Sequence, residues 1–294
     1  MKILITGATG FIGKNLIKRL LSEKHDLWAI IRPSSKLEQI DKKVKTYIFN
    51  DNVEDLIIFF NQEKFDGVIH LASLFLGQHT SKDIRGLIDS NILFATTILE
   101  VSVKTNTRWF INTGTFFQNY KNKKYSPVNL YSATKQAFED IAKYYLDTTN
   151  INFVTIKLCD TFGPDDSRPK IFNLWSKISR TGEKFDMSPG KQIIDINFVE
   201  NVIDGYMEMI SLLSKDNKRK MNGQVFLIKS NQRMSLRKLA LTFEKTLKCK
   251  LNINWGGREY RTREVMSPWK GDKSIPGWKP KITIEDGIRK TFTK

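Results

Sequence analysis

The sequence is poor in the residues that build disulfides and metal sites. It has 294 residues but only two cysteines, Cys159 and Cys249, and three histidines that lie far apart. Two cysteines exclude a disulfide-stabilised scaffold and are typical of a protein in a reducing cytoplasm. Because no group of cysteines and histidines has the spacing of metal ligands, we expect no metal centre.

Long hydrophobic runs are also absent. No stretch of about 18 apolar residues occurs, so we expect no membrane span. At the N-terminus, the apolar residues Ile3–Ile5 run directly into Thr6 and Gly7. This is the pattern of a first β-strand, and it lacks the apolar core and cleavage site of a secretory signal. These absences predict a cytoplasmic protein.

Acidic residues are scarce relative to basic ones. There are 48 Lys and Arg against 31 Asp and Glu, which gives a formal net charge of +17. Such a surface can bind nucleic acid, can draw an anionic substrate into a basic cleft, or can be a generic lysine-rich surface. The lysines are spread along the chain without a recognition motif, so we expect no specific nucleic-acid partner. A non-catalytic RNA-binding domain is the alternative from another functional class.

The first two-thirds of the chain alternate apolar, β-branched runs with segments of helical periodicity, as parallel βαβ units do. The expected strands are 2–6, 27–31, 45–49, 67–71, 108–113 and 153–158. The expected helices are 13–22, 53–61, 84–105, 132–148, 170–180, 199–213 and 235–247. The pattern predicts an α/β fold with a doubly wound parallel sheet of the Rossmann type over residues 1–165. Residues 166–294 are expected to form a smaller C-terminal substrate-binding lobe, with an interleaved boundary.

A glycine-rich turn follows the first expected strand. Gly7, Gly10 and Gly13 lie between that strand and a helix, where glycine permits a tight turn and a close approach of the backbone to a pyrophosphate. The free N–H groups at the start of the helix favour the same anion. The turn therefore predicts a dinucleotide-binding loop. The cofactor-binding residues expected here are Gly7, Thr9, Gly10, Phe11, Ile12 and Gly13.

The end of the second expected strand indicates which nicotinamide cofactor binds. The carboxylate that would bind the ribose 2′-hydroxyl of NAD is absent, because Ile31 holds its place and Arg32 follows. A guanidinium can bind the 2′-phosphate of NADP, and Ser35 lies close by in the sequence. We therefore expect NADP(H) as the preferred cofactor, with NAD(H) as the alternative.

Tyr131 and Lys135 carry the expected proton chemistry. They are four residues apart at the start of a helical segment, so they share one helix face. An ammonium beside a phenol favours the phenolate and brings the pKa of the phenol towards a useful range. Upstream, Thr115 lies just past the end of a strand and is expected to hydrogen-bond a substrate carbonyl. Thr113 is the second candidate for that role.

Together these motifs resemble the extended short-chain dehydrogenase/reductases, the NAD-dependent epimerase/dehydratase family that acts on nucleotide sugars. The segment Val68–Ala72 resembles the family's fourth strand, Asn50-Asp51 resembles its adenine-contacting pair, and residues 158–164 resemble the segment that meets the nicotinamide. The resemblance implies a nucleotide-sugar substrate and a homodimer. Its expected cofactor-binding residues are Asn50, Asp51, Leu71, Ala72, Ser73, Asn91, Thr113, Tyr131, Lys135, Leu158 and Thr161.

Within the family, residues 110–115 and 130–136 look most similar to the CDP-abequose and CDP-paratose synthase branch, whose members reduce 4-keto sugars. One position departs from the family pattern, since Ile194 stands where an arginine usually precedes Asp195. Basic residues further along the chain are the alternative diphosphate contacts, because guanidinium suits bidentate phosphate binding. The expected substrate-binding residues are Thr115, Phe116, Asn173, Arg258 and Arg263.

Three reactions of the family compete. A 4,6-dehydratase places an Asp-Glu pair after its catalytic threonine, but Phe116 and Phe117 cannot transfer protons. A 4-epimerase retains the acidic residue that binds the ribose of NAD, and Arg32 replaces it here. A reductase needs only Tyr131, Lys135, the threonine and the cofactor. The expected enzyme is therefore an NADPH-dependent oxidoreductase that reduces a CDP- or dTDP-linked 4-keto-6-deoxyhexose for bacterial surface polysaccharide. An NAD-dependent nucleotide-sugar 4-epimerase is the alternative.

Overall fold

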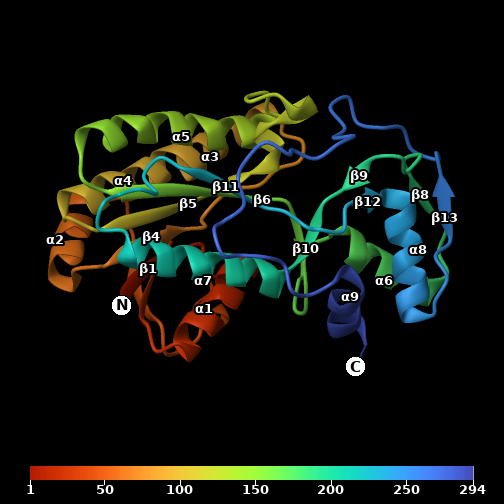
Figure 1. The fold of residues 1–294 in the computed structure, drawn as a ribbon, viewed down its shortest axis with the longest axis horizontal. Coiled ribbons are helices and arrows are strands. Elements are labelled where there is room, and N and C mark those ends of the chain that lie inside the picture. Colours follow the sequence, from red (N-terminus) through yellow and green to blue (C-terminus); the bar gives the residue numbers. More distant parts are fainter. Residues whose placement is uncertain (294) are drawn as a thin grey trace.

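A parallel β-sheet forms the centre of the larger lobe (Figure 1). The computed structural model describes residues 1–293. The sheet has seven strands in the order β11-β6-β5-β4-β1-β2-β3, and all its pairings are parallel. The strands are β1 (Lys2–Thr6), β2 (Asp26–Ile31), β3 (Lys45–Ile48), β4 (Gly67–His70), β5 (Trp109–Thr115), β6 (Asn152–Leu158) and β11 (Val225–Ile228). The strand order reverses between β1 and β4, and ligands of such sheets bind outside the carboxyl ends of the strands at that point.

Helices cover both faces of this sheet. One face carries α1 (Phe11–Ser22) and α7 (Val199–Lys215). The other face carries α2 (Val53–Glu63), α4 (Phe94–Lys104) and α5 (Leu130–Thr148). The central strands are thus buried on both sides, which explains why they read as continuous apolar runs and not as alternating ones. The predicted doubly wound fold of the Rossmann type is confirmed.

A turn of π-helix interrupts the helical segment that the sequence predicts as continuous. α3 (Ile84–Ile88) runs into the π-helical turn Asp89–Leu93, called η3, before α4 begins. By length and composition alone, Ser81–Lys104 could cross a membrane, with a mean hydropathy of 1.3. In this structure α4 packs against α2 and α5 through the buried Ile98 and Leu99. That packing is typical of a core helix in a globular domain.

The smaller lobe, at the right of Figure 1, has its own core of aromatic and aliphatic residues such as Phe162, Trp175 and Phe243. Its elements are α6 (Ile171–Thr181), α8 (Leu236–Leu247), α9 (Ile284–Phe292), β7 (Asp160–Phe162), β8 (Phe185–Met187), β9 (Ile193–Ile194), β10 (Ile196–Phe198), β12 (Met234–Ser235) and β13 (Ile253–Trp255). Between β10 and β12 the chain returns to the larger lobe to form α7 and β11. The chain therefore crosses between the lobes several times. A single boundary after residue 165 remains a prediction.

Candidate active site

The glycine turn lies where β1 ends and α1 begins, at the carboxyl edge of the sheet. Gly7 has φ +73°, and a Cβ there would lie 2.7 Å from the Ala72 nitrogen, so the turn requires glycine. α1 begins at Phe11 with no side-chain cap and no acidic residue in its first turn. The N–H groups of that turn are therefore available to a diphosphate, which is the fit that a dinucleotide cofactor requires.

Other expected cofactor residues line the same edge of the sheet. Arg32 and Ser35 form a turn after β2, where the Arg32 N–H donates to Ser35 Oγ at 3.0 Å and the Arg32 side chain is exposed. Asn50 and Asp51 follow the neighbouring strand β3 and are exposed as well. The structure thus brings these four residues to adjacent strand ends. Of the other expected residues, Leu71, Ala72 and Leu158 lie at the ends of β4 and β6, Thr9 and Gly10 lie in the glycine turn, and Ile12 and Gly13 lie in the first turn of α1. Thr161 lies apart from this edge, in β7 of the smaller lobe.

Tyr131 and Lys135 lie on the first turns of α5, one turn apart. Asn129 caps this helix by accepting a first-turn backbone N–H at 2.9 Å. The expectation that the ammonium lowers the pKa of the phenol is not met in the free protein, because burial raises the pKa of Tyr131 to about 12, although a hydrogen bond with Ser73 opposes the rise. Burial also lowers the pKa of Lys135 to about 8, with the charge of Glu139 opposing this change. At neutral pH the pair is therefore a neutral phenol near an ammonium, and the phenol can donate a proton.

Asn91 ties the loop after β4 to α5. It is fully buried in the η3 turn; its Oδ1 accepts the Leu74 N–H at 2.8 Å, and its Nδ2 donates to Thr134 Oγ1 at 3.0 Å. Ser73 Oγ donates to the same Oδ1 at 3.2 Å. Because protein groups satisfy its amide, Asn91 shapes the loop that carries Ser73. A direct contact between Asn91 and the cofactor remains a prediction.

The two candidate threonines have different partners. Thr113 Oγ1 lies 2.7 Å from the hydroxyl of Tyr206, a fully buried residue of α7. Thr115 Oγ1 accepts the Phe117 N–H at 3.3 Å, which leaves the proton of its own hydroxyl available. This arrangement favours Thr115 over Thr113 as the donor to a substrate carbonyl. Phe116, the next residue, is buried in a small apolar cluster.

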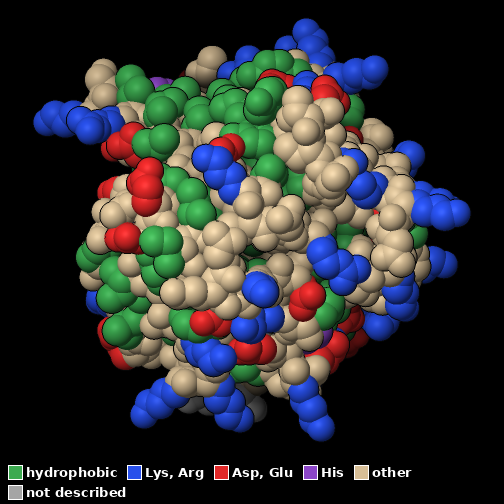
Figure 2. Space-filling view, turned by 90° about the vertical axis from the view of Figure 1, so that its left-hand side faces the viewer, with side chains coloured by type: hydrophobic (Ala, Val, Ile, Leu, Met, Phe, Trp, Pro, Cys, Tyr) green, Lys and Arg blue, Asp and Glu red, His purple; other side chains and the backbone are tan. Residues whose placement is uncertain are grey.

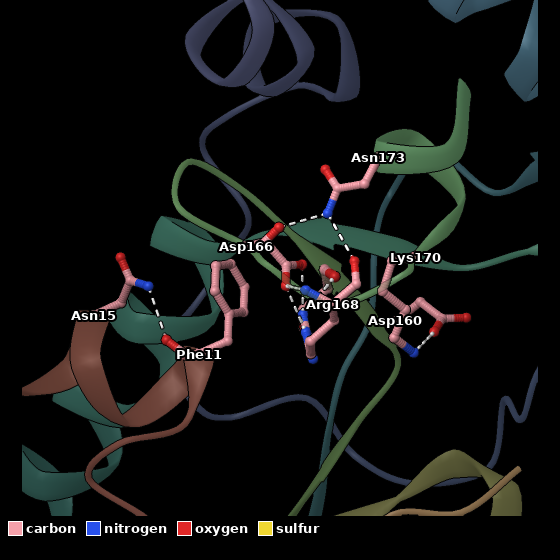
Figure 3. A network of polar contacts seen from close by, with 8 residues as sticks. Phe11, Asn15, Asp160, Asp166, Arg168, Lys170 and Asn173 are labelled. Carbon is pink, nitrogen blue, oxygen red and sulfur yellow. Dashed lines mark hydrogen bonds and ion pairs between the residues drawn. The ribbon is translucent and has the colours of Figure 1, made fainter. Parts of the chain in front are cut away.

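Arg168 bridges the two lobes beside the glycine turn (Figure 3). Its guanidinium lies 4.5 Å from the centroid of the Phe11 ring, and its Nη2 donates to Thr161 Oγ1 at 3.2 Å. The buried carboxylate of Asp166 accepts from Arg168 Nε at 2.7 Å. Asn173 on α6 donates to the Asp166 and Arg168 carbonyls at 2.6 and 2.9 Å. The segment between β7 and α6 is therefore fastened to the start of α1.

A second aromatic contact lies next to the tyrosine. The ring of Phe75 packs edge-on against Tyr131, with 5.0 Å between the centroids, and Lys170 Nζ lies 5.2 Å from the Phe75 centroid. Lys170 also pairs with Asp160 at 3.3 Å, on the smaller-lobe side of Figure 3. Phe75 thus lies between Tyr131 and the segment that enters α6.

Of the arginines expected to bind a diphosphate, Arg263 has protein partners. Its Nη2 donates to Ser126 Oγ at 2.9 Å, and its guanidinium lies 4.2 Å from the centroid of the Tyr120 ring. These contacts hold the loop before α5. The Arg258 side chain is exposed. A substrate contact for either arginine remains a prediction.

A guanidinium lies beside Ile194 although no arginine precedes Asp195 in the sequence. Arg233 comes just before β12, in which Met234 pairs with Ile194 of β9. Arg233 Nε donates to the fully buried Asp195 carboxylate at 2.6 Å, and its Nη2 donates to the Trp269 carbonyl at 2.9 Å. Asp195 therefore pairs with an arginine that is distant in sequence, just before β12, and not with the residue next to it.

The sequence did not reveal Arg168, Tyr206 or Arg233 as parts of this region. Their partners are all distant in sequence. Arg168 contacts the Phe11 ring, Tyr206 hydrogen-bonds with Thr113, and Arg233 binds Asp195. No local spacing connects such residues, so only the fold could identify them. A signal that was available is the spacing of four residues between Lys135 and Glu139, which places both on one face of α5.

Comparisons with known proteins agree with this geometry. The model of the NAD dependent epimerase/dehydratase family matches residues 3–222. The chain is 25% identical over 299 residues to CDP-abequose synthase of Salmonella typhimurium, covering 99% of this chain and 97% of that one. It is 21% identical over 324 residues to UDP-glucose 4-epimerase of Lactobacillus helveticus, covering 100% and 96% of the two chains.

Solved structures share the fold. UDP-glucose 4-epimerase of Thermotoga maritima with UDP-glucose has a TM-score of 0.84 and 18% identity, covering 99% of this chain and 97% of that one. UDP-glucuronic acid 4-epimerase from Bacillus cereus in complex with UDP-glucuronic acid and NAD has a TM-score of 0.82 and 20% identity, covering 99% and 98%. At these identities the likeness shows the fold alone. The family match covers most of the chain and shows more: the chain belongs to the NAD dependent epimerase/dehydratase family.

Proposed function

We propose that this chain uses NADPH to reduce the 4-keto group of a CDP- or dTDP-linked 4-keto-6-deoxyhexose, for a bacterial surface polysaccharide. The observation that carries the proposal is the composition of the site. Tyr131 and Lys135 are both present, and Phe116, which is buried and apolar, lies where a dehydratase needs an acid. The likeness to CDP-abequose synthase over the full chain supports the same chemistry.

In this reaction the C=O group becomes CH–OH. The reduced nicotinamide, when bound, supplies the hydride to the carbonyl carbon. The Tyr131 hydroxyl donates its proton to the carbonyl oxygen, and the Thr115 hydroxyl donates a hydrogen bond to that oxygen and polarises the bond. The Lys135 ammonium stabilises the phenolate that remains, which then takes a proton from solvent. No further acid or base is needed, and Phe116 offers none.

The choice of NADPH rests on Arg32. Its exposed side chain and the Ser35 hydroxyl lie at the end of β2, where the 2′-substituent of an adenosine ribose would lie. A guanidinium there attracts a 2′-phosphate, and no carboxylate at Ile31 repels it. An exchangeable NADPH suits net reduction, which consumes one reduced cofactor in each turnover.

A 4-epimerase is the second candidate, and some of the relatives support it. UDP-glucose 4-epimerase is among the similar proteins, and a UDP-glucuronic acid 4-epimerase of similar fold was solved with NAD. The same Tyr131, Lys135 and Thr115 would serve an epimerase, in which the hydride returns to the sugar. Arg32, the residue after β2, is what favours the reductase over the epimerase, because an NAD-dependent epimerase would have an acidic residue at this strand end.

The test is a cofactor assay with CDP- and dTDP-4-keto-6-deoxyglucose. We expect oxidation of NADPH, faster than of NADH, and a product with a C4 hydroxyl. Tyr131→Phe should lower the rate by about 10²–10⁴-fold, whereas Tyr125→Phe, at a tyrosine that is 54% exposed, should not. Interconversion of UDP-glucose and UDP-galactose without added cofactor, together with no NADPH oxidation, would support the epimerase instead.

We also propose that the chain works in the cytoplasm as a homodimer. Large apolar side chains are exposed on neighbouring elements at one side of the larger lobe, with Leu93 of η3 60% and Tyr144 of α5 65% accessible. Figure 2 shows hydrophobic side chains gathered at the top of its view, where α5 lies in Figure 1. Exposed apolar surface of this kind is typical of association sites.

A further inference from the structure

A buried charge cluster lies behind the candidate catalytic residues. Lys157 on β6 has a side chain that is only 6% exposed, and its Nζ lies 3.3 Å from Asp272 Oδ2. Its second partner is Asn119, whose Oδ1 accepts from Nζ at 3.0 Å. Asp272 comes from the C-terminal segment and also accepts from Trp269 Nε1 at 2.7 Å. Such pairing offsets the cost of burying an ammonium.

Glu139 joins this cluster to the backbone of Thr115. Its Oε1 accepts from the fully buried Gln118 Nε2 at 2.9 Å, and Gln118 Oε1 accepts the Thr115 N–H at 2.9 Å. The Gln118 and Glu139 side chains leave little space beside Gly114. A Cβ on Gly114 would lie 2.9 Å from Gln118 Oε1 and 3.0 Å from Glu139 Oε1, so a larger residue at position 114 would displace these two side chains.

Glu139 also lies one helical turn after Lys135, and its negative charge favours the ammonium form of that lysine. Burial raises the pKa of the Glu139 carboxyl, while the charges of Lys157 and Lys135 and the Gln118 hydrogen bond oppose the rise. The negative charge of Asp272 raises the pKa of the Glu139 carboxyl further. Lys157 is therefore the main counter-charge that keeps Glu139 ionised beside Lys135.

The remaining groups around Lys135 are neutral or distant. On β4, burial and the Lys135 charge hold the pKa of His70 well below its ordinary value, so this histidine is neutral. Tyr131 of α5 is a neutral phenol, and η3 presents the amide of Asn91 to α5. The carboxylate of α4 that faces α5, Glu100, acts on Tyr145 near the opposite end of the helix.

We propose that Glu139 is a positioning residue that acts on two catalytic groups at once: it holds Lys135 through its charge and Thr115 through Gln118, and Lys157 and Asp272 hold Glu139 in turn. The inference rests on the proposed roles of Lys135 and Thr115. It makes the C-terminal segment around Asp272 part of the support of the active site, although that segment lies far from Lys135 in sequence.

The charge role is tested without any substrate by NMR titration of the free protein labelled with ¹³C-lysine. Lys135 should titrate near pH 8, apart from ordinary lysines, and its signal is identified by its loss in Lys135→Arg. Glu139→Gln keeps an oxygen for Gln118 but removes the charge, so the midpoint should fall by about one pH unit. Asp140→Asn, at the exposed neighbouring carboxylate, should leave it unchanged. An unchanged midpoint in Glu139→Gln would overturn the proposal.

The hydrogen-bond role is tested with Glu139→Asp, which keeps the charge but is too short to reach Gln118. The Lys135 midpoint should stay near its original value in this variant, and a midpoint as low as in Glu139→Gln would contradict the role of the charge. In the reductase assay, Glu139→Asp should lower kcat without moving the pH profile, and Glu139→Gln should move the alkaline limb to lower pH. Equal kcat in Glu139→Asp and the unaltered protein would overturn the link to Thr115. A chain that reduces no sugar but shows the expected midpoints would count against the proposed function alone.

Discussion

At the residue scale, Lys135 shows how a group proposed to act in catalysis can oppose stability. Its side chain is 1% exposed, and burial lowers its pKa from 10.5 to about 8. Replacement by methionine removes a charge from a buried site, so Lys135→Met should raise the free energy of unfolding at pH 7 by roughly 1–3 kcal/mol. Urea unfolding measures this change, with Lys143→Met on the exposed side of α5 as the control. The same variant should lose reductase activity. A variant that is less stable than the control would contradict this description of the buried charge.

The same pKa shift predicts a pH dependence with a definite sign. Between pH 8 and pH 10.5 the unfolded chain binds more protons at Lys135 than the folded chain does, so this residue makes stability rise with pH across that window. Activity should fall over the same window, because the ammonium that we propose to stabilise the Tyr131 phenolate is lost above pH 8. Unfolding and rate profiles over this range, compared with those of Lys135→Met, isolate the contribution. A stability difference between the two proteins that does not vary with pH would contradict it.

Gly7 offers a second test at this scale. Gly7→Ala would place a Cβ 2.7 Å from the Ala72 nitrogen in a residue with φ +73°. We expect a loss of stability of about 2–4 kcal/mol and a weaker affinity for NADPH, because the turn must shift away from β4. Gly182→Ala is a matched control, since Gly182 has φ +70° but nothing lies within 4 Å of its Cβ. The control should lose only about 1 kcal/mol. Equal losses in urea unfolding would show that crowding at Ala72 has no effect.

At the scale of elements, the sequence predicted the Rossmann half and two helices of the smaller lobe, α6 and α8, well, but it missed the short strands of that lobe and α9. The buried strands and amphipathic helices have strong periodic patterns, and their observed ends lie within two residues of the expected ones. β11 was missed because it is a four-residue edge strand that pairs with β6 across a long stretch of chain. The η3 turn was missed because the hydrophobic pattern continues through it. Arg233 was missed for a similar reason, since only the β9–β12 pairing brings it to Asp195.

The segment between β7 and α6 gives a prediction about cofactor affinity. Arg168 holds this segment against Phe11, at the first turn of the helix that would bind the diphosphate. Arg168→Ala removes a cation–π contact and leaves the buried Asp166 carboxylate unpaired, so NADPH binding should weaken by about three- to thirty-fold. Fluorescence titration with NADPH measures this effect. Arg180→Ala, on α6 but with its guanidinium donating only to a carbonyl of its own helix, is the control. Equal affinities in the two variants would separate this segment from the cofactor site.

At the scale of the whole molecule, net charge and apolar surface make opposing contributions to self-association. Each chain carries a formal charge of +17, so two copies repel one another, and a homodimer needs an apolar contact such as the surface around Leu93 and Tyr144. Leu93→Glu should convert the proposed dimer to a monomer in light-scattering measurements. Ile58→Glu, at a 55% exposed position on α2, should not. Added salt should strengthen the association, since it screens the repulsion and leaves the apolar contact intact. A dimer that dissociates in salt, or that survives Leu93→Glu as well as it survives Ile58→Glu, would place the interface on another face of the molecule.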